Sequence, residues 1–481
     1  MNIELPALRS SAPLLDAYLE YFERTRTPFT IPGHKQRAHL LDAGLGAVVD
    51  SDTPLYGGLD EIKLTHQTLK KAESLAATFW GADWARFSTG GSTHANQAVV
   101  LALGKPGEKI AVARTAHRSI LSAIVLAGLE PIWLTPEIDG ATGIPLGIPL
   151  SEVERALGEK PIAVLLTEPG YLGTLSDLPP IITAAHAHNV PVIIDAAWGA
   201  HFGFTPELPQ HVIQLGADAL ITSIHKALPG YSASALLLAQ GTYLNLDRLE
   251  QSFETTHTTS PAGAPLASID GIRALLQNRG AELTSALVHR VEKFKAEVQS
   301  HFDLPIFLYP SDFPVGRFDA SKIVLRTNNL GASGIAIERA LLESNIRVEM
   351  ADKENMVFLA TIADRDEDYA TLAAALIPIL KAEQGEPRPV KTSVSWSIKP
   401  TPAISMREAY FAETELIDAN QAVGRISADL IAPYPPGVAV LAPGELITQA
   451  VIDGLTSAKA DGVRIAYATD PTLAQFRVVR A

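Results

Sequence analysis

The feature that most constrains the fold of this chain is a regular alternation of short apolar runs with helical stretches, which begins near residue 68. Short runs of Val, Ile, Leu and Ala are typical of strands that are buried on both faces of a parallel sheet. Such runs lie at 109–114, 131–136, 161–169, 191–198 and 217–226, and stretches with helical periodicity lie at 68–82, 92–104, 117–128 and 178–189. This order predicts an α/β domain in which helices cover both faces of a mostly parallel sheet.

The rest of the chain predicts smaller units around this domain. A second set of apolar runs and helical stretches after residue 311 indicates a smaller α/β domain, and the Pro-rich stretch after it indicates a linker, because each Pro removes a backbone donor and disfavours helix. The predicted units are an N-terminal segment (1–67), a large domain (68–310), a small α/β domain (311–382), a linker (383–405) and an appended C-terminal domain (406–481).

Composition excludes several classes of function. The formal net charge of −14 argues against a nucleic-acid partner, and the absence of cysteine excludes disulfides, thiolate metal sites and cysteine nucleophiles. No apolar run approaches the roughly 18 residues that a membrane-spanning helix needs, and the first 25 residues do not have the pattern of a signal peptide. We therefore expect a cytoplasmic protein with no membrane partner and, in the absence of a zinc HExxH pattern, no metal.

In open parallel sheets, ligands bind outside the carboxyl ends of the strands, so the polar residues that follow each run are candidates for a site. Ser92 and Thr93 follow two glycines at the start of a predicted helix, where unpaired N–H groups and the helix dipole suit a phosphate. His117 follows the run at 109–114. Helix capping by Ser92 and Thr93, and simple packing of His117, are the alternatives.

Asp195 and Lys226 end two neighbouring runs. Asp195 closes "PVIID", and Lys226 lies in "ITSIHKALPG", about one strand-helix-strand unit further along the chain. A carboxylate at a buried strand end is costly unless it meets a cation or hydrogen-bond donors, and a partly buried lysine can become a nucleophile toward an aldehyde. Taken alone, Asp195 is also consistent with a helix cap, and Lys226 with an exposed strand end.

Together these residues describe a site for pyridoxal 5'-phosphate (PLP). Its phosphate would bind at Ser92, Thr93 and Ser223. Asp195 would pair with the protonated pyridine nitrogen, which makes the ring an electron sink, and the ring would lie against His117. Lys226 would hold the aldehyde as a Schiff base. The chain has neither a P-loop nor a glycine-rich dinucleotide fingerprint, which removes the commonest competing cofactor sites.

With these residues in place, the chain resembles the Orn/Lys/Arg decarboxylase family of fold-type I PLP enzymes, in its short form. The resemblance rests on "FTIPGHK" (29–35), "GGLDEI" (57–62), "SIHKALP" (223–229), "HTTSPAGAPLASIDG" (257–271), "EMAD" (349–352) and "GRISADLIAPYPPGVAVLAPGE" (424–445). It implies the fold-type I arrangement of a large PLP-binding domain with a mostly parallel sheet, a smaller α/β domain and an appended C-terminal domain.

The resemblance also implies residue roles. The implied catalytic residues are Lys226, which is the Schiff-base lysine, and its neighbours at the cofactor, His225 and His117. The implied cofactor-binding set comprises these three with Ser92, Thr93, Asp195, Ala197, Trp198, Ser223, Thr258 and Thr259. Thr258 and Thr259 would reach the phosphate of a neighbouring subunit, so family membership implies a homodimer or a higher homo-oligomer with active sites at the subunit interface.

The implied substrate is a basic L-amino acid, which would be decarboxylated to its amine and CO2 in polyamine-type metabolism. Arginine, lysine and ornithine all remain candidates, with a preference for arginine or lysine, and the basic side chain would meet Asp429 or Glu445. The sequence departs from the family pattern at Ala196, at Gly263, where an aromatic residue is common, and at Asp429, which is often Glu. Two alternatives remain open. The same cofactor site could support another PLP reaction at Cα, such as transamination, and the departures at Ala196 and Gly263 leave open a non-catalytic binding or regulatory protein with this fold.

Overall fold

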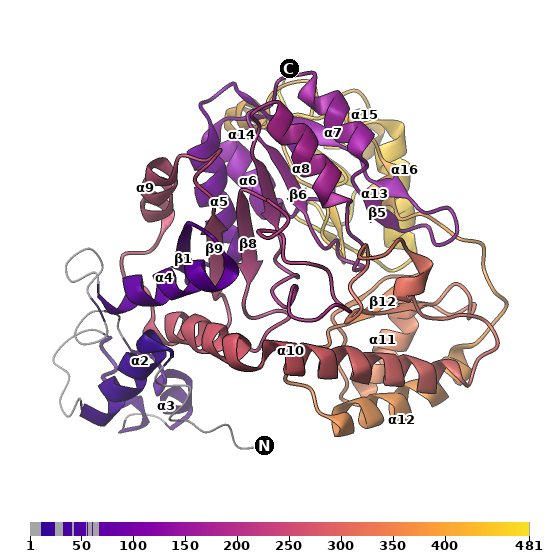
Figure 1. Cartoon of the computed structure of the whole chain (residues 1–481). Coiled ribbons are helices and arrows are strands. Elements are labelled where there is room, and N and C mark those ends of the chain that lie inside the picture. The colour runs from indigo at the N-terminus through magenta and orange to yellow at the C-terminus, as the bar shows by residue number, and fades with distance from the viewer. Residues whose placement is uncertain are drawn as a thin grey trace.

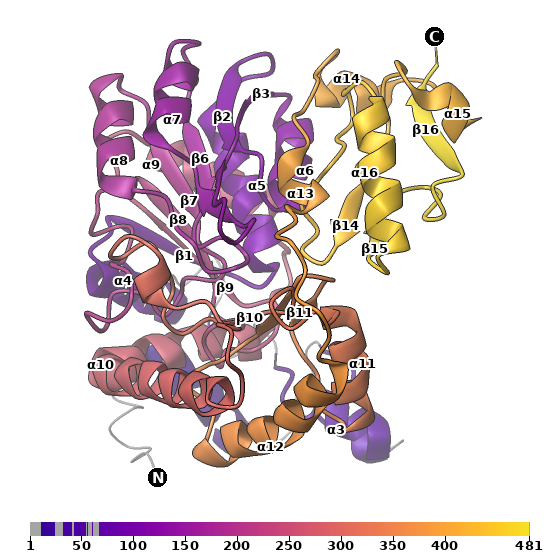
Figure 2. The ribbon, with the colours of Figure 1, turned by 90° about the vertical axis from the view of Figure 1, so that its right-hand side faces the viewer.

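The computed structural model describes residues 11–24, 32–40, 43–53, 55, 60 and 67–480 of the 481-residue chain. Parts of the motifs at 29–35 and 57–62 lie outside these residues. Figure 1 shows the large sheet with its helices above a long helix, α10, and Figure 2 shows the small domain below and the C-terminal domain beside the large domain. Within the described residues, no helix combines the length and the apolar character needed to cross a membrane.

A seven-stranded sheet forms the centre of the large domain, in the order β1-β9-β8-β7-β6-β2-β3. All of its strands run parallel except β9, which is antiparallel to both neighbours. The five predicted runs form β2 (Lys109–Ala113), β3 (Glu130–Leu134), β6 (Val164–Thr167), β7 (Val192–Asp195) and β8 (Ala219–Ser223). The prediction did not name β1 (Trp84–Ser88), β9 (Ala235–Ala239) or the small hairpin β4 (Glu137–Ile138) and β5 (Pro145–Gly147).

Helices cover both faces of this sheet, as the alternation predicts. One hydrophobic cluster packs α5, α6 and α9 on one face, and another packs α4, α7, α8 and the first half of α10 on the other. Successive residues of each strand, such as Ile193 and Ile194 of β7, enter opposite clusters, which explains why these strands are continuously apolar. The helices are α4 (Thr68–Trp80), α5 (Gly91–Leu103), α6 (Arg118–Ala127), α7 (Leu150–Leu157), α8 (Leu178–Ala187), α9 (Leu246–Thr256) and α10 (Gly263–Gln299).

The small domain contains an antiparallel sheet in the order β10-β12-β11. Residues near the start of α10, such as Ile269, pack in the core of the large domain, whereas residues near its end, such as Phe294, pack in the core of the small domain. The predicted boundary at residue 310 therefore does not separate the two cores, because one helix contributes to both. The elements are η2 (Pro310–Asp312), β10 (Ile323–Arg326), α11 (Gly334–Glu343), β11 (Met350–Ala351), β12 (Asn355–Phe358) and α12 (Asp366–Glu383).

An N-terminal helix packs against α10 on the side of the large domain. Near its start, the N–H of Leu14 donates to the buried carboxylate of Asp270 at 2.8 Å, and Asp270 also forms an ion pair with Arg273 at 2.7 Å. These contacts attach the described part of the N-terminal segment to the large domain. Its elements are α2 (Pro13–Arg24), η1 (Ala38–Leu40) and α3 (Ala43–Val49).

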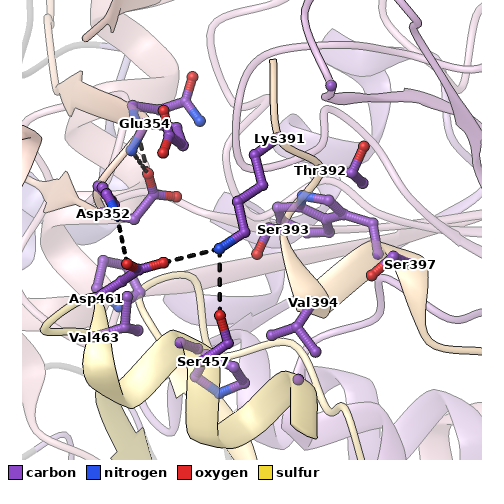
Figure 3. A pocket seen from close by; sticks show the side chains of 18 of the residues that line it. Asp352, Glu354, Lys391, Thr392, Ser393, Val394, Ser397, Ser457, Asp461 and Val463 are labelled. Atoms are coloured by element: carbon purple, nitrogen blue, oxygen red, sulfur yellow. Dashed lines mark hydrogen bonds and ion pairs between the residues drawn. The ribbon is translucent and has the colours of Figure 1, made fainter. Parts of the chain in front are cut away.

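The predicted linker is packed between domains. Trp396 from its short helix α13 (Val394–Ser397) lies in a hydrophobic cluster with residues of the large, small and C-terminal domains. Lys391 donates to the carboxylate of Asp461 at 3.0 Å and to Ser457 at 3.3 Å, as Figure 3 shows. Asp461 also pairs with Lys353 of the small domain. The stretch therefore joins the domains by contacts and not only by the covalent chain.

The C-terminal domain is a compact unit of two small sheets and three helices that packs beside α6. Met406 and Ala439 enter the hydrophobic cluster of α5 and α6, which fixes this domain against the large domain. Its elements are α14 (Met406–Phe411), β13 (Thr414–Asp418), α15 (Ala419–Ala422), β14 (Ala432–Tyr434), α16 (Gln449–Ala460), β15 (Arg464–Ala466) and β16 (Gln475–Val479). β13 pairs with β16, and β14 pairs with β15.

Candidate active site

The carboxyl end of β7 presents a buried carboxylate, Asp195. This strand is parallel to β8, with Asp195 opposite Ile221. One oxygen of Asp195 accepts a hydrogen bond from the side-chain amide of Asn96 at 3.0 Å, and the other accepts one from the N–H of Ala197 at 3.2 Å. Among the described residues, none forms an ion pair with Asp195. Because a buried carboxylate is costly without a cation, this arrangement suits a cationic group of a ligand.

Lys226 lies in the tight loop that follows β8. The N–H of Gly230 donates to the carbonyl of Ile224 at 3.0 Å, and a Cβ added at Gly230 would lie 2.7 Å from that oxygen, so only glycine fits this turn. The ammonium of Lys226 lies 4.9 Å from the centre of the Trp198 ring. Burial lowers the pKa of Lys226, and the negative charges of Asp195 and Glu349 oppose this shift. The neutral amine, which is the nucleophilic form, is therefore more accessible than in an exposed lysine.

The start of α5 provides the predicted phosphate-suited position. Gly91, the first residue of this 13-residue helix, has a left-handed φ of 68°. The hydroxyl of Ser92 lies 2.8 Å from the hydroxyl of Ser223, the last residue of β8, so the structure joins these two predicted residues. Thr93 is exposed in the first turn of the same helix. The hydroxyls and the free N–H groups of the helix start together suit an anion.

His117 caps the start of α6 and also lies in the site. Its Nδ1 accepts a hydrogen bond from the N–H of Ser119 at 3.2 Å, which leaves the proton of the neutral ring on Nε2. Burial lowers the pKa of His117, and the charges of Asp195 and Lys226 also act on it. The capping alternative is therefore observed, and it is compatible with the functional prediction, because the cap leaves a neutral imidazole on which the charges of Asp195 and Lys226 act.

Several residues near the site were not predicted from the sequence. Asn96 and Ser119 share a hydrogen bond at 3.0 Å beside Asp195, and Lys322 of the small domain lies over the ring of Trp198. Tyr171 is buried, which raises its pKa, and the charge of Asp195 contributes to that shift. These residues lie in two helices, α5 and α6, or in loops, so only their contacts in the folded chain connect them with the strand ends.

The C-terminal domain reaches the same region. Tyr434 and Tyr467 of this domain both contribute to the raised pKa of Tyr171, whose other neighbour is Asp195. The guanidinium of Arg118, at the start of α6, lies 4.3 Å from the centre of the Tyr467 ring. The C-terminal domain therefore extends toward the strand ends that carry the predicted site.

The remaining predicted cofactor residues include His225, in the loop of Lys226, and two threonines, Thr258 and Thr259, that lie elsewhere. The Nδ1 of His225 lies 3.0 Å from the carbonyl oxygen of Ser234, so this nitrogen carries a proton and donates. Thr258 and Thr259 lie after α9, where they line a different cavity of about 770 Å³ together with Glu73 and Arg86. Within one chain, the structure therefore does not bring the two threonines into the group around Lys226.

Glu445 and Asp429, the predicted anchors for a basic side chain, have partners inside the protein. The carboxylate of Glu445 is buried and binds the guanidinium of Arg114 through two hydrogen bonds of 2.6 and 2.9 Å. This pairing argues against Glu445 as the substrate anchor, because both of its oxygens already neutralise a buried cation. Asp429 accepts a hydrogen bond from the N–H of Thr469 at 2.8 Å and lies 3.7 Å from the guanidinium of Arg477.

The ion pair between Arg114 and Glu445 joins the end of β2 to the C-terminal domain, so its loss is expected to be costly. A Glu445→Ala variant would leave the Arg114 guanidinium buried without a counter-charge, which is expected to lower the free energy of unfolding by about 3–5 kcal/mol. Urea unfolding followed by far-UV circular dichroism measures this change. Replacing the pair by Met and Leu in one double variant is expected to recover most of the loss, and a Glu445→Ala variant as stable as the wild type would contradict the structural role.

The residues of this site fit PLP. Asp195 has no ion pair with a described residue, and would pair with the protonated ring nitrogen. Lys226, which is partly buried and on which the charge of Asp195 acts, would hold the aldehyde carbon. Ser92, Ser223 and the N–H groups of α5 would bind the phosphate. The imidazole of His117 would pack against the pyridine ring.

Comparison with known proteins identifies the family. The model of the Orn/Lys/Arg decarboxylase major domain matches residues 12–312, and that of the C-terminal domain matches residues 391–462. The chain is 33% identical to arginine decarboxylase of Bacillus anthracis over 97% of both chains. It is also 33% identical to arginine decarboxylase of Bacillus subtilis, over 97% of this chain and 98% of that one. Constitutive lysine decarboxylase of Escherichia coli is 26% identical, over 91% of this chain and 75% of that protein.

Solved structures show the same fold. Constitutive lysine decarboxylase of E. coli superposes with a TM-score of 0.79 at 22% identity, over 98% of this chain and 82% of that one. Lysine decarboxylase of Francisella novicida superposes with a TM-score of 0.81 at 20% identity, over 98% of this chain and 81% of that one. Serine palmitoyltransferase of Sphingomonas wittichii superposes with a TM-score of 0.55 at 13% identity, over 78% of this chain and 85% of that one. The predicted fold-type I architecture is therefore confirmed, and the chain belongs to the Orn/Lys/Arg decarboxylase family.

Proposed function

We propose that this protein removes the α-carboxylate of a basic L-amino acid, arginine or lysine, as CO2 and releases the corresponding amine. The observation that carries this proposal is a buried carboxylate, Asp195, and a partly buried amine, Lys226, at or just after the carboxyl ends of the adjacent strands β7 and β8. The relatives that share a third of the sequence over almost the whole chain are arginine decarboxylases, which favours arginine as the first substrate to test.

As a member of its family, the chain is a PLP-dependent decarboxylase. When bound, PLP supplies an electron sink for the electron pair that remains on the substrate when CO2 leaves. The chain holds the charges around that sink. Asp195 would maintain the positive charge on the ring nitrogen, and the helix start at Ser92 would neutralise part of the phosphate charge. The surrounding buried side chains would exclude water and thereby strengthen these interactions.

Lys226 is better placed than His225 to return a proton to the substrate Cα. The Nδ1–H of His225 donates to the carbonyl of Ser234 at 3.0 Å, so this proton is held by the backbone. Burial lowers the pKa of Lys226, so its ammonium gives up a proton more readily than that of an exposed lysine. We therefore assign the proton transfer to Nζ of Lys226.

For the basic end of the substrate, we propose Glu349 in place of Glu445. Glu349 is an exposed carboxylate of the small domain, and its charge acts on both Lys226 and Lys322. An exposed carboxylate whose charge acts on these two lysines has room to meet a cationic side chain, whereas Glu445 is enclosed with Arg114.

We also propose that two subunits build each site. Thr258 and Thr259 lie outside the group around Lys226 in their own chain, and they line a cavity next to the start of α10. This position supports a role at the site of a second copy of the chain, which the family resemblance implies. Sedimentation of the PLP-loaded protein tests the predicted homodimer.

A substrate panel tests the proposed reaction. Purified protein with added PLP is incubated with arginine, lysine or ornithine, and the CO2 and the amine are measured together. One of the three is expected to yield CO2 and amine in equal amounts. Production of a keto acid and pyridoxamine phosphate would instead establish transamination, and binding of PLP with no turnover of any basic amino acid would support the non-catalytic alternative.

A further inference from the structure

Lys322 is a buried lysine at the junction of the small and large domains, and no hydrogen bond or ion pair joins its ammonium to another described residue. Its side chain lies just before β10, is almost completely buried, and places Nζ 3.8 Å from the centre of the Trp198 ring. The ammonium of Lys226 lies 4.9 Å from the centre of the same ring. Among the residues that the structure describes, none forms a hydrogen bond or an ion pair with Nζ of Lys322. Because burying an unpaired charge is costly, such a group indicates a site for an anion.

The fold holds the stem of Lys322 in a defined position. A Cβ added at Gly173 would lie 2.6 Å from Cγ of Lys322, so the stem packs directly on the backbone of this glycine. The N–H of Lys322 donates to the carbonyl of Asp319 at 3.0 Å. One oxygen of the Asp319 carboxylate, Oδ1, lies 3.2 Å from Nε2 of His201 and accepts a hydrogen bond from the hydroxyl of Ser321 at 2.6 Å. The charge of Asp319 acts on Lys322, but in the described structure neither carboxylate oxygen forms a hydrogen bond or an ion pair with the ammonium, which leaves it available.

The ammonium is charged under ordinary conditions. Burial lowers the pKa of Lys322 to about 8, while the charges of Asp319 and Glu349 oppose the shift and that of Lys226 adds to it. Most molecules therefore carry the positive charge at neutral pH. Lys322 and Lys226 both contact the ring of Trp198, which is three residues after Asp195 in the chain. The ammonium of Lys322 therefore lies within the predicted active site.

We propose that Lys322 binds the α-carboxylate of the substrate. This inference rests on the proposed function, since every amino-acid substrate carries one carboxylate on the carbon that bears its α-amine. The α-amine must approach Lys226, and the carboxylate then arrives close to the second ammonium over the same ring. A charged hydrogen bond to Lys322 would fix the direction of the bond that breaks, which is a positioning effect on the scissile group itself.

A matched pair of ligands tests the proposal. The guanidinium compounds δ-guanidinovalerate and butylguanidine differ only in a carboxylate, and neither carries an α-amine that could react. Isothermal titration calorimetry with the PLP-loaded wild type is expected to show tighter binding of δ-guanidinovalerate. In Lys322→Met, its dissociation constant is expected to rise about 10- to 100-fold, the range for a hydrogen bond to a charged group, while that of butylguanidine changes less than about 2-fold.

Lys295→Met is the matched control. Lys295 is also a buried lysine of the small domain, but its ammonium donates to the carbonyl of Leu308 at 3.1 Å, and the variant is expected to keep the carboxylate preference. Equal weakening of both ligands in Lys322→Met, or no change in either, would overturn the proposal. Lys322→Gln, in which a neutral polar side chain is retained, distinguishes lost charge from lost packing, since it is also expected to lose the preference. A wild type that binds neither ligand and releases no CO2 would instead refute the proposed function.

Discussion

A Lys226→Ala variant is expected to lose about 10³-fold or more in kcat for CO2 release. The change removes the amine that would hold the cofactor aldehyde and that we assign to the proton transfer at Cα. The loop around Gly230 and the ring of Trp198 would remain in place, because alanine is smaller and the turn does not depend on the lysine head group. The measurement is CO2 release with PLP in excess, at saturating amino acid.

Two observations separate this effect from a general loss of structure. Lys295→Met, which removes another buried lysine, is expected to keep kcat within about 3-fold, well short of the loss expected for a catalytic acid or base. Borohydride treatment of the PLP-loaded wild type, followed by peptide mass spectrometry, is expected to find the cofactor attached at Lys226 and at no other lysine. A Lys226→Ala variant with wild-type turnover would refute the proposed mechanism.

An Asp195→Asn variant is expected to lose about 10²- to 10³-fold in kcat, the usual cost of removing one preorganised electrostatic contact from an active site. The amide has the size of the carboxylate and can still accept a hydrogen bond from Asn96, so the variant isolates the charge. The affinity for PLP is also expected to fall, because the ring nitrogen would lose its counter-charge. Fluorescence titration of the apoprotein with PLP measures this second effect without turnover.

Asp218 offers a matched control for Asp195. It is an equally buried aspartate beside the neighbouring strand β8, but it precedes that strand and accepts hydrogen bonds from the N–H of Val192 at 2.7 Å and from His186 at 2.8 Å. Asp218→Asn is therefore expected to change stability while leaving kcat and PLP affinity unchanged. If both asparagine variants lost activity to the same extent, the special role of the carboxyl end of β7 would be untenable.

The parallel part of the sheet could be predicted from the sequence, because strands buried on both faces are continuous apolar runs between helices. β9 was missed although it is equally apolar, since its five residues follow the Lys226 loop without a helix between them and run antiparallel. β1 was missed because only three residues separate it from α4 and because it includes the half-buried residues Trp84 and Arg86, so it is not a continuous apolar run. Local sequence patterns do not indicate that β9 pairs with β1 and β8.

The same limit applies to the site. Asp195 and Lys226 could be predicted because strand ends of one parallel sheet share an edge. Lys322 comes from another domain, and its neighbourhood with Trp198 depends on the packing of the small domain against the large one. The partner of Glu445 is 331 residues away in the chain, so no local signal indicated that its carboxylate was already engaged by Arg114.

The position of β9 between β1 and β8 also determines when the sheet can be completed during translation. β1 ends at Ser88, but within the described chain its only neighbour in the sheet is β9, which begins at Ala235. At the usual rate of about 5–20 residues per second, the ribosome needs roughly 7 to 30 s to make the intervening chain. Throughout that interval the nascent chain carries β1 with both edges open, while β2, β3 and β6 can already pair. Chaperone binding to stalled nascent chains is therefore expected to decline once Ala239 has left the exit tunnel.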